Sequence, residues 1–360
     1  MRGRGHGQAR YFAGCPARGK DDVYRKVQNA APIRNRIDVT EPAECDIFLT
    51  AALGGNDMIG RMRTDAAARP GEVGEVAVNM DMDKAVLFDS KPEEQPRQKM
   101  MSYWERQFSL RQLLPDFGDW LDWMARESAG VRDRLGLNRV TYGSHARQWI
   151  EIGGPPGAVL PVFIHGGYWR ALEAEISRFA LPWMQAMAGA SANVEYRLMP
   201  EVPLAAVVDD AEAALRTIAS ETGARLLVVG HSAGGHLAMM GALRCPEIVA
   251  GVVGISGLFD LAPLPHSFLA EEVGLTAPDV EGLSPHMLWQ GTAAHVTVAY
   301  GAEETPEFQR QSQMFGAIYG ARLLEVPGRH HMSVLQDLAD PGGVIAREIK
   351  RRFQEPGPQS

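Results

Sequence analysis

Leu226-Leu227-Val228-Val229-Gly230-His231-Ser232-Ala233-Gly234 is the stretch that decides the fold of this chain. Its G-x-S-x-G pattern directly follows a run of large aliphatic side chains, which is typical of a short buried strand. The residues from Gly235 to Leu243 then predict a helix. A sharp turn between such a strand and helix exposes the serine hydroxyl, and the two flanking glycines avoid side-chain clashes. The stretch therefore predicts that Ser232 is a nucleophile rather than an incidental serine in a glycine-rich turn.

Strands and helices are expected to alternate on both sides of this turn. Further strands are predicted at Leu160–Ile164, Ala192–Tyr196, Ile248–Ile255, His295–Tyr300 and Arg322–Val326, and helices at about 116–135, 175–188 and 203–220. This order is typical of an α/β fold in which helices cover both faces of a mostly parallel sheet. Ligands of such sheets bind at the carboxyl ends of the strands, where Ser232 is expected.

The N-terminal part of the chain has a different character. Residues 1–32 are rich in Gly, Arg and Ala without periodicity, and they predict a disordered tail. Residues 33–90 predict a small β-rich module. Its short β-rich runs, separated by glycine-containing turns, are Ile37–Val39, Asp46–Leu49, Val76–Val78 and Ala85–Phe88. Residues 91–99, rich in charge and proline, predict a linker before a catalytic domain at 100–355.

Two sequence patterns in this N-terminal part resemble segments of ATP-binding proteins. Residues 14–20 nearly match a phosphate-binding loop, but Asp21 stands where a magnesium-binding hydroxyl is required, so we reject nucleotide binding. The run from Gly71 to Asp89 resembles the end of the OB-like TOBE barrel that follows the ATPase domain of ABC transporters, over about 36–89. Because no ATPase domain precedes it here, a remnant or fused module is the simpler interpretation.

Composition narrows the range of partners and cofactors. The 360 residues are 45% hydrophobic and 22% charged, as expected of a folded soluble protein. The net charge of -8 argues against nucleic acid or an anionic membrane as partner. Cys15, Cys45 and Cys245 are scattered without metal-ligand spacing, and no apolar run approaches a membrane span or signal peptide. We therefore expect a cytoplasmic protein with a small-molecule substrate and no metal or other cofactor. The sequence leaves open whether it forms a homodimer.

A serine nucleophile needs a base to accept its proton. In this architecture the chain order is serine, acid, histidine. His330 and His331 follow the predicted strand that ends at Val326, on a loop at the same sheet edge as Ser232. We favour His331 as the general base, and an exposed loop histidine is the alternative for either residue.

An acid must orient that base. Glu303 and Glu304 follow the strand that ends at Tyr300, and we favour Glu304. Asp260, after the preceding strand, is the remaining alternative, although a turn or helix cap explains it more simply.

Acyl transfer also requires N–H donors for the oxyanion that forms. His165-Gly166-Gly167-Tyr168-Trp169 follows the predicted strand at 160–164 and provides the glycine-rich loop expected there. The predicted donors are the backbone N–H groups of Gly167, Tyr168 and Ala233. His165 is interpreted as a structural hydrogen-bonding residue of this loop.

Four motifs together resemble the kynurenine formamidase (arylformamidase) family of α/β-hydrolases. They are H-G-G-Y-W at 165–169, Y-R-L-M-P-E-V at 196–202, G-H-S-A-G-G-H-L at 230–237 and T-P-E-F-Q-R-Q-S at 305–312, within a similarity over about 104–338. The resemblance implies the α/β-hydrolase fold and hydrolysis of N-formyl-L-kynurenine to L-kynurenine and formate in tryptophan catabolism. By motif, it places the nucleophile at Ser232, the acid at Glu304 and the histidine at His331. One departure is that well-known members have Asp where this chain has Glu304.

The resemblance also implies where an anthranilic ring would bind. Tyr168 and Trp169 are candidates to stack on it, although Trp169 fits equally well as packing that fixes the loop. A carboxylesterase of the same fold would use the same machinery and differ only in pocket shape. A non-catalytic binding or regulatory protein is a third interpretation, which the intact triad positions disfavour.

Overall fold

The computed structural model describes residues 32–43, 46–53, 56–63, 74–79, 103–290 and 294–354, and for the first four ranges only the course of the backbone. The chain divides into two compact units, Met1–Gln98 and Lys99–Ser360. The predicted strand at 85–88, the linker at 91–99 and the predicted tail up to residue 31 lie outside the described residues.

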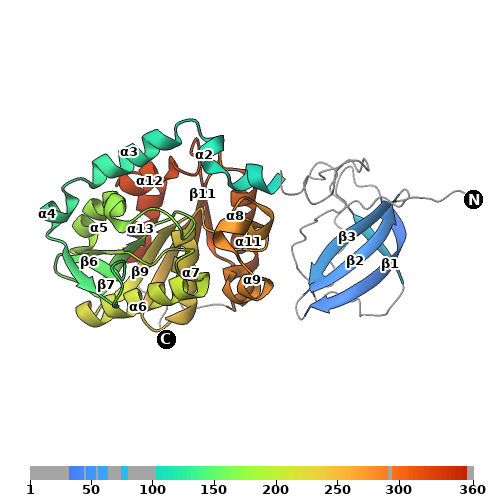
Figure 1. The fold of residues 1–360 in the computed structure, drawn as a ribbon, viewed down its shortest axis with the longest axis horizontal. Helices are drawn as coiled ribbons and strands as arrows, with labels where there is room; N and C mark the ends of the chain where they lie inside the picture. Colours follow the sequence, from blue (N-terminus) through green and yellow to red (C-terminus); the bar gives the residue numbers. More distant parts are fainter. Residues whose placement is uncertain are drawn as a thin grey trace, which may run out of the picture. The chain divides into compact units, whose positions relative to one another are not determined.

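The first unit contains a four-stranded antiparallel sheet (Figure 1). Its strands are β1 (Pro32–Ala43), β2 (Asp46–Leu53), β3 (Asn56–Arg63) and β4 (Gly74–Asn79), in the order β3-β2-β1-β4. The runs predicted at 37–39, 46–49 and 76–78 lie within β1, β2 and β4. The sequence analysis did not predict β3, because Ile59 is its one β-branched residue.

The second unit is built around an eight-stranded sheet in the order β12-β11-β10-β9-β7-β8-β6-β5. Its strands are β5 (Asn138–Thr141), β6 (Trp149–Gly153), β7 (Val159–Ile164), β8 (Ser191–Val194), β9 (Arg225–His231), β10 (Val249–Ile255), β11 (His295–Gly301) and β12 (Arg322–Val326). The strands from β8 through β7 to β12 pair in parallel, whereas β6 is antiparallel to both β8 and β5. The predicted mostly parallel α/β sheet is confirmed.

Helices cover both faces of this sheet (Figure 1). They are α2 (Leu110–Leu113), α3 (Phe117–Ser128), α4 (Val131–Leu135), α5 (Leu181–Ala188), α6 (Leu204–Thr222), α7 (Ala233–Arg244), α8 (Leu269–Val273), α9 (Ala277–Leu283), α10 (Pro285–Leu288), α11 (Pro306–Tyr319), α12 (Val334–Ala339) and α13 (Val344–Gln354), with 3-10 turns at Ala174–Ala180 and Leu264–His266. None of the helices in the described part of the chain has the length and apolarity needed to cross a membrane.

Strand β9 shows how the sequence divides the core into two layers. Successive side chains of a strand point to opposite faces of the sheet. Leu226 and Val228 accordingly pack with α6, α7 and α11, whereas Leu227 and Val229 pack with α5, α12 and α13. Because β9 is buried on both faces, its residues from Leu226 to Val229 are all apolar instead of alternating with polar ones, as expected of a central parallel strand.

Two predicted helices differ from the observed ones. The helix expected at 116–135 is divided into α3 and α4 at Gly130, whose φ of +66° favours glycine. The helix expected at 175–188 begins as a 3-10 turn and becomes α5 only at Leu181.

Candidate active site

Ser232 lies on the sharp turn between β9 and α7. Its φ of +57° and ψ of -121° place a non-glycine residue in a strained backbone region. The Ser232 N–H donates a 2.8 Å hydrogen bond to the carbonyl of Ile255, the last residue of the neighbouring strand β10. This contact ties the turn to the carboxyl edge of the sheet, and the side chain of Ser232 lines a cavity there.

Glycine is required on both sides of this turn because backbone atoms approach closely. A Cβ on Gly230 would overlap the carbonyl oxygen of Gly234, and a Cβ on Gly234 would overlap the carbonyl oxygen of Ile164 at the end of β7. The neighbouring atoms belong to the backbone of central elements and cannot move aside cheaply. The two glycines therefore permit the turn that presents Ser232.

Replacing Gly234 with alanine is expected to destabilise the fold by more than about 2 kcal/mol, because the new methyl group overlaps a backbone carbonyl. Thermal and urea unfolding monitored by circular dichroism measures the effect. Gly118→Ala in α3 is the matched control, since the space around that position is open and alanine favours a helix. Equal stability of the two variants would contradict the close approach.

The residues predicted as acid and base, Glu304 and His331, are in contact in the second unit. The Oε2 atom of Glu304 lies 3.1 Å from Nδ1 of His331. The other carboxylate oxygen, Oε1, accepts hydrogen bonds from the Ser256 hydroxyl at 2.5 Å and from the Gly301 N–H at 2.7 Å. Glu304 and His331 are both buried, whereas Glu303 is exposed. Two donors thus hold one oxygen of Glu304 and leave the other facing the imidazole.

His231 fixes the backbone that carries His331. Burial, together with the nearby charge of His331, lowers the pKa of His231 well below its usual value. A neutral His231 can donate from Nε2 to the carbonyl oxygen of His331, 2.8 Å away. On the other side, the ring of Phe308 packs 4.2 Å from the imidazole of His331, centroid to centroid. The imidazole is therefore held between α11 and the turn that carries Ser232.

Ser232 and His331 line the same cavity of about 550 Å³. Among the described residues no hydrogen bond joins the Ser232 hydroxyl to the imidazole. Such contacts are often long without substrate and shorten when it binds. The predicted nucleophile and base thus line one cavity at the carboxyl edge of the sheet, and the predicted acid contacts the base from behind it.

The loop after β7 passes close to the nucleophile. A Cβ on Gly166 would lie 3.1 Å from the Cβ of Ser232, and Gly167 has a φ of +105°. Gly167 and Tyr168 line the cavity beside Ser232. Ala233 begins α7, so its N–H has no carbonyl of its own helix to bond. The three predicted oxyanion donors thus lie on the two loops that flank the Ser232 side chain.

Comparison with known proteins agrees with this geometry. A family described as "alpha/beta hydrolase fold" matches residues 161–329. The chain is a hydrolase with the α/β-hydrolase fold. It is similar to kynurenine formamidase of Salmo salar, with 25% identity over 275 residues that cover 70% of this chain and 93% of that protein. Kynurenine formamidase of Danio rerio is 26% identical over 235 residues, which cover 59% and 80% of the two chains.

Solved structures give the same fold. The crystal structure of a candidate thioesterase from a Silicibacter species superposes with a TM-score of 0.64 at 27% identity, covering 68% of this hydrolase and 98% of that chain. An arylesterase superposes with a TM-score of 0.52 at 17% identity, covering 72% of this hydrolase and 99% of that chain. At that identity, the second likeness shows the fold alone.

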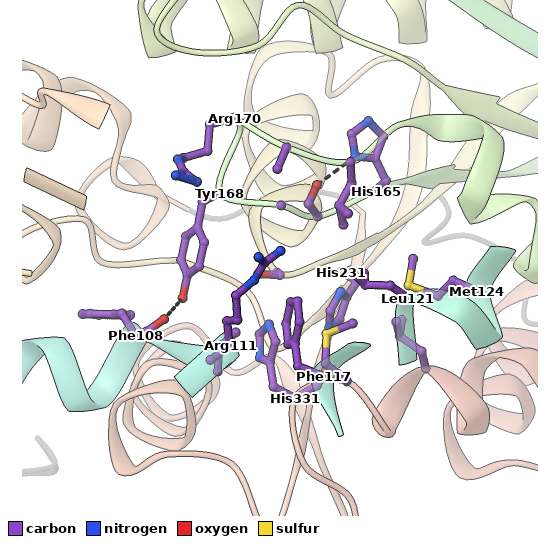
Figure 2. A pocket seen from close by; sticks show the side chains of 18 of the residues that line it. Phe108, Arg111, Phe117, Leu121, Met124, His165, Tyr168, Arg170, His231 and His331 are labelled. Carbon is purple, nitrogen blue, oxygen red and sulfur yellow. Dashed lines mark hydrogen bonds between the residues drawn. The ribbon is translucent and has the colours of Figure 1, made fainter. Parts of the chain in front are cut away.

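The two aromatic residues of the loop after β7, Tyr168 and Trp169, have different surroundings. Tyr168 lines the cavity of the hydrolase, and its hydroxyl donates a 2.8 Å hydrogen bond to the carbonyl of Phe108 (Figure 2). Trp169 is fully buried outside the cavity lining, with its ring 5.0 Å from that of His236. Of the two roles considered for Trp169, its surroundings therefore match packing that fixes the loop.

Two other sequence candidates have structural partners. Asp260 makes an ion pair with Arg310 at 2.7 Å and accepts from the Ala262 N–H, so it acts as a turn residue away from the base. His165 is buried and stacks on Tyr196, whose hydroxyl donates to the His165 carbonyl at 2.9 Å. Throughout 103–290 and 294–354, no group of three or more His, Cys, Asp or Glu side chains is arranged to hold a metal ion.

One wall of the cavity comes from residues 103–124, which we call the entrance segment. The sequence analysis did not assign them to the site, because the apolar side of α3 is indistinguishable from an ordinary core-facing helix. Two hydrogen bonds fix the segment beside the start of α11. The buried Gln107 accepts from the Thr305 hydroxyl through its carbonyl at 2.9 Å, and from the Glu307 N–H through its side chain at 3.1 Å. Apolar side chains dominate the cavity wall, among them Phe108, Leu110, Phe117, Leu121, Met124, Phe163, Phe179 and Phe268.

Proposed function

We propose that this α/β-hydrolase is a serine hydrolase that cleaves a small aryl formamide, N-formyl-L-kynurenine, to L-kynurenine and formate. The observation that carries the proposal is the 3.1 Å contact between Glu304 and His331, together with the cavity that both His331 and Ser232 line. The similarity to kynurenine formamidases supports the choice of substrate. The same reaction would place the protein in tryptophan catabolism.

In the proposed mechanism His331 accepts the proton of the Ser232 hydroxyl as its oxygen attacks the formyl carbon. Glu304 holds the Nδ1–H tautomer, so that Nε2 is the atom that receives the proton. The oxyanion accepts hydrogen bonds from the N–H groups of the oxyanion loop and of Ala233. The protonated imidazole then gives its proton to the arylamine, which leaves as L-kynurenine. Water, deprotonated by the same imidazole, releases formate from the formyl ester of Ser232.

The cavity suits an aromatic substrate of this size. Its volume of about 550 Å³ lies within the range of small-molecule sites. The aromatic rings of Phe108, Phe117, Phe179 and Tyr168 line it, and aryl groups gain from packing on such rings beyond the burial of their area.

A carboxylesterase acting on small esters is the second candidate, because an arylesterase and other esterases share the fold. The two candidates are separated by measuring kcat/KM for N-formyl-L-kynurenine and for p-nitrophenyl acetate with the same preparation. Preference for the formamide supports the proposal, and preference for the ester would replace it. No turnover of either would favour a non-catalytic protein.

Chelators are expected to leave the activity unchanged, since in the proposed mechanism an imidazole activates the nucleophile. Dialysis against EDTA followed by the formamidase assay provides the check, with an added-zinc sample alongside. Activity that falls on dialysis and returns with zinc would contradict the mechanism.

A further inference from the structure

Arg111 brings a positive charge into an otherwise largely apolar cavity. It is the second residue of α2 on the entrance segment, and it lines the cavity although its side chain is also exposed. Figure 2 shows its guanidinium extending from the helix into the cavity. The Cζ atom lies 5.7 Å from the centroid of the Phe117 ring. The side chain thus reaches inward along an aromatic wall.

The charge of Arg111 is available to a ligand. Arg170, the other arginine of the cavity lining, makes an ion pair with Glu272 at 2.6 Å. Within the described ranges, by contrast, no carboxylate lies within ion-pair distance of Arg111. A guanidinium binds carboxylates through paired N–H donors and stays charged at every physiological pH. Arg111 therefore meets the requirements of a carboxylate-binding residue.

Glu105 adds the opposite charge on the same segment. Its exposed side chain also lines the cavity, and it forms no ion pair with Arg111 or with any other described residue. The backbone between the two residues is anchored, because the Phe108 carbonyl accepts from Tyr168 and Gln107 binds both Thr305 and Glu307. The cation and the anion are therefore presented from a segment tied to the catalytic loops.

We propose that the entrance segment recognises the α-amino acid end of the substrate, with Arg111 binding its carboxylate and Glu105 its ammonium group. This inference rests on the proposed function, because N-formyl-L-kynurenine carries the formamide on its ring and an amino acid at the other end. With the formyl group at Ser232, the chain of the substrate leads toward the entrance segment. The hydrolase thereby selects aryl formamides that are also free amino acids.

Three substrates separate these roles: N-formyl-L-kynurenine, its desamino analogue, which keeps the carboxylate, and ortho-formamidoacetophenone, which lacks the whole amino-acid end. For Arg111→Gln, the ratio of kcat/KM between the desamino analogue and the acetophenone should fall by about tenfold, through KM. A tenfold fall corresponds to the weakest charge-assisted hydrogen bonds. We expect a weak one here because the guanidinium of Arg111 is exposed and solvent screens its charge. For Glu105→Gln, the ratio that should fall is that of kcat/KM for N-formyl-L-kynurenine to kcat/KM for its desamino analogue, because only the former carries the ammonium group.

Arg126→Gln is the control for the change in net charge, since Arg126 is exposed on α3 outside the cavity lining. It should keep all three ratios of the parent enzyme. Equal losses on every substrate in Arg111→Gln would indicate a merely structural role, and unchanged ratios would show that Arg111 does not touch the substrate. Either result overturns the proposal.

Failure of the proposed function is distinguishable from failure of this inference. If the parent enzyme hydrolyses esters but not formamides, the same variants are assayed with mono-p-nitrophenyl succinate and p-nitrophenyl butyrate. Loss of preference for the anionic ester in Arg111→Gln would retain carboxylate recognition without the formamidase assignment. An unchanged preference for the anionic ester in Arg111→Gln would reject both carboxylate recognition and the formamidase assignment.

Discussion

Ser232→Ala should reduce kcat by about 10³-fold or more while leaving the fold intact, because triad members act as a unit. The substitution removes the oxygen that attacks the formyl carbon in the proposed mechanism, and it keeps every other group of the cavity. Alanine can occupy the same strained turn, since the backbone contact to Ile255 uses the N–H of residue 232 and not its side chain. Steady-state formamidase kinetics measures the loss, and thermal unfolding monitors the fold.

Ser177→Ala is the matched control for this experiment. Ser177 also lines the cavity, but its hydroxyl donates to the Glu173 carbonyl at 3.3 Å in the 3-10 turn before α5. The same chemical change there should alter kcat only slightly. Comparable losses in both serine variants would indicate general sensitivity of the cavity and would remove the case for a nucleophile.

The nucleophile turn was predictable because its determinants are local. The aliphatic run before Gly230 specifies a buried strand, and the glycines on either side of Ser232 mark a sharp turn at its end. The preference for Glu304 over Glu303 came from the chain order and the motif alone. The structure adds the reason, which is that Glu304 faces His331 while Glu303 is exposed.

The features that the sequence did not predict depend on contacts between distant residues. Gln107 meets Thr305 and Glu307 only after the chain has folded, so no local pattern marks the entrance segment as part of the site. Which of Tyr168 and Trp169 faces the cavity depends on successive positive φ angles of +50° and +58°. Residue preferences do not specify such angles for aromatic side chains. The short antiparallel strands β5 and β6 were not predicted.

Glu304→Gln should lower kcat by about 10³- to 10⁴-fold, because an amide does not hold the imidazole in the tautomer that accepts the serine proton. The neutral side chain also stabilises the imidazolium of the transition state less. Oε1 accepts from Ser256 and Gly301, so the amide would turn its NH₂ toward His331, a donor facing a donor. The measurement is kcat for N-formyl-L-kynurenine at the pH of maximal activity of the parent enzyme.

Glu303→Gln and Glu304→Asp make the test specific to one carboxylate at one distance. Glu303 is exposed, so its loss of charge should change kcat little. Glu304→Asp restores the residue type of well-known kynurenine formamidases and keeps a carboxylate, so it should retain far more activity than Glu304→Gln. Aspartate is one methylene shorter, so its carboxylate would lie farther from Nδ1 of His331 than the 3.1 Å of Glu304. Some loss of activity therefore remains. If Glu303→Gln were the more damaging substitution, the acid would have to be reassigned, and the contact between Glu304 and His331 would then serve only to pack the loop.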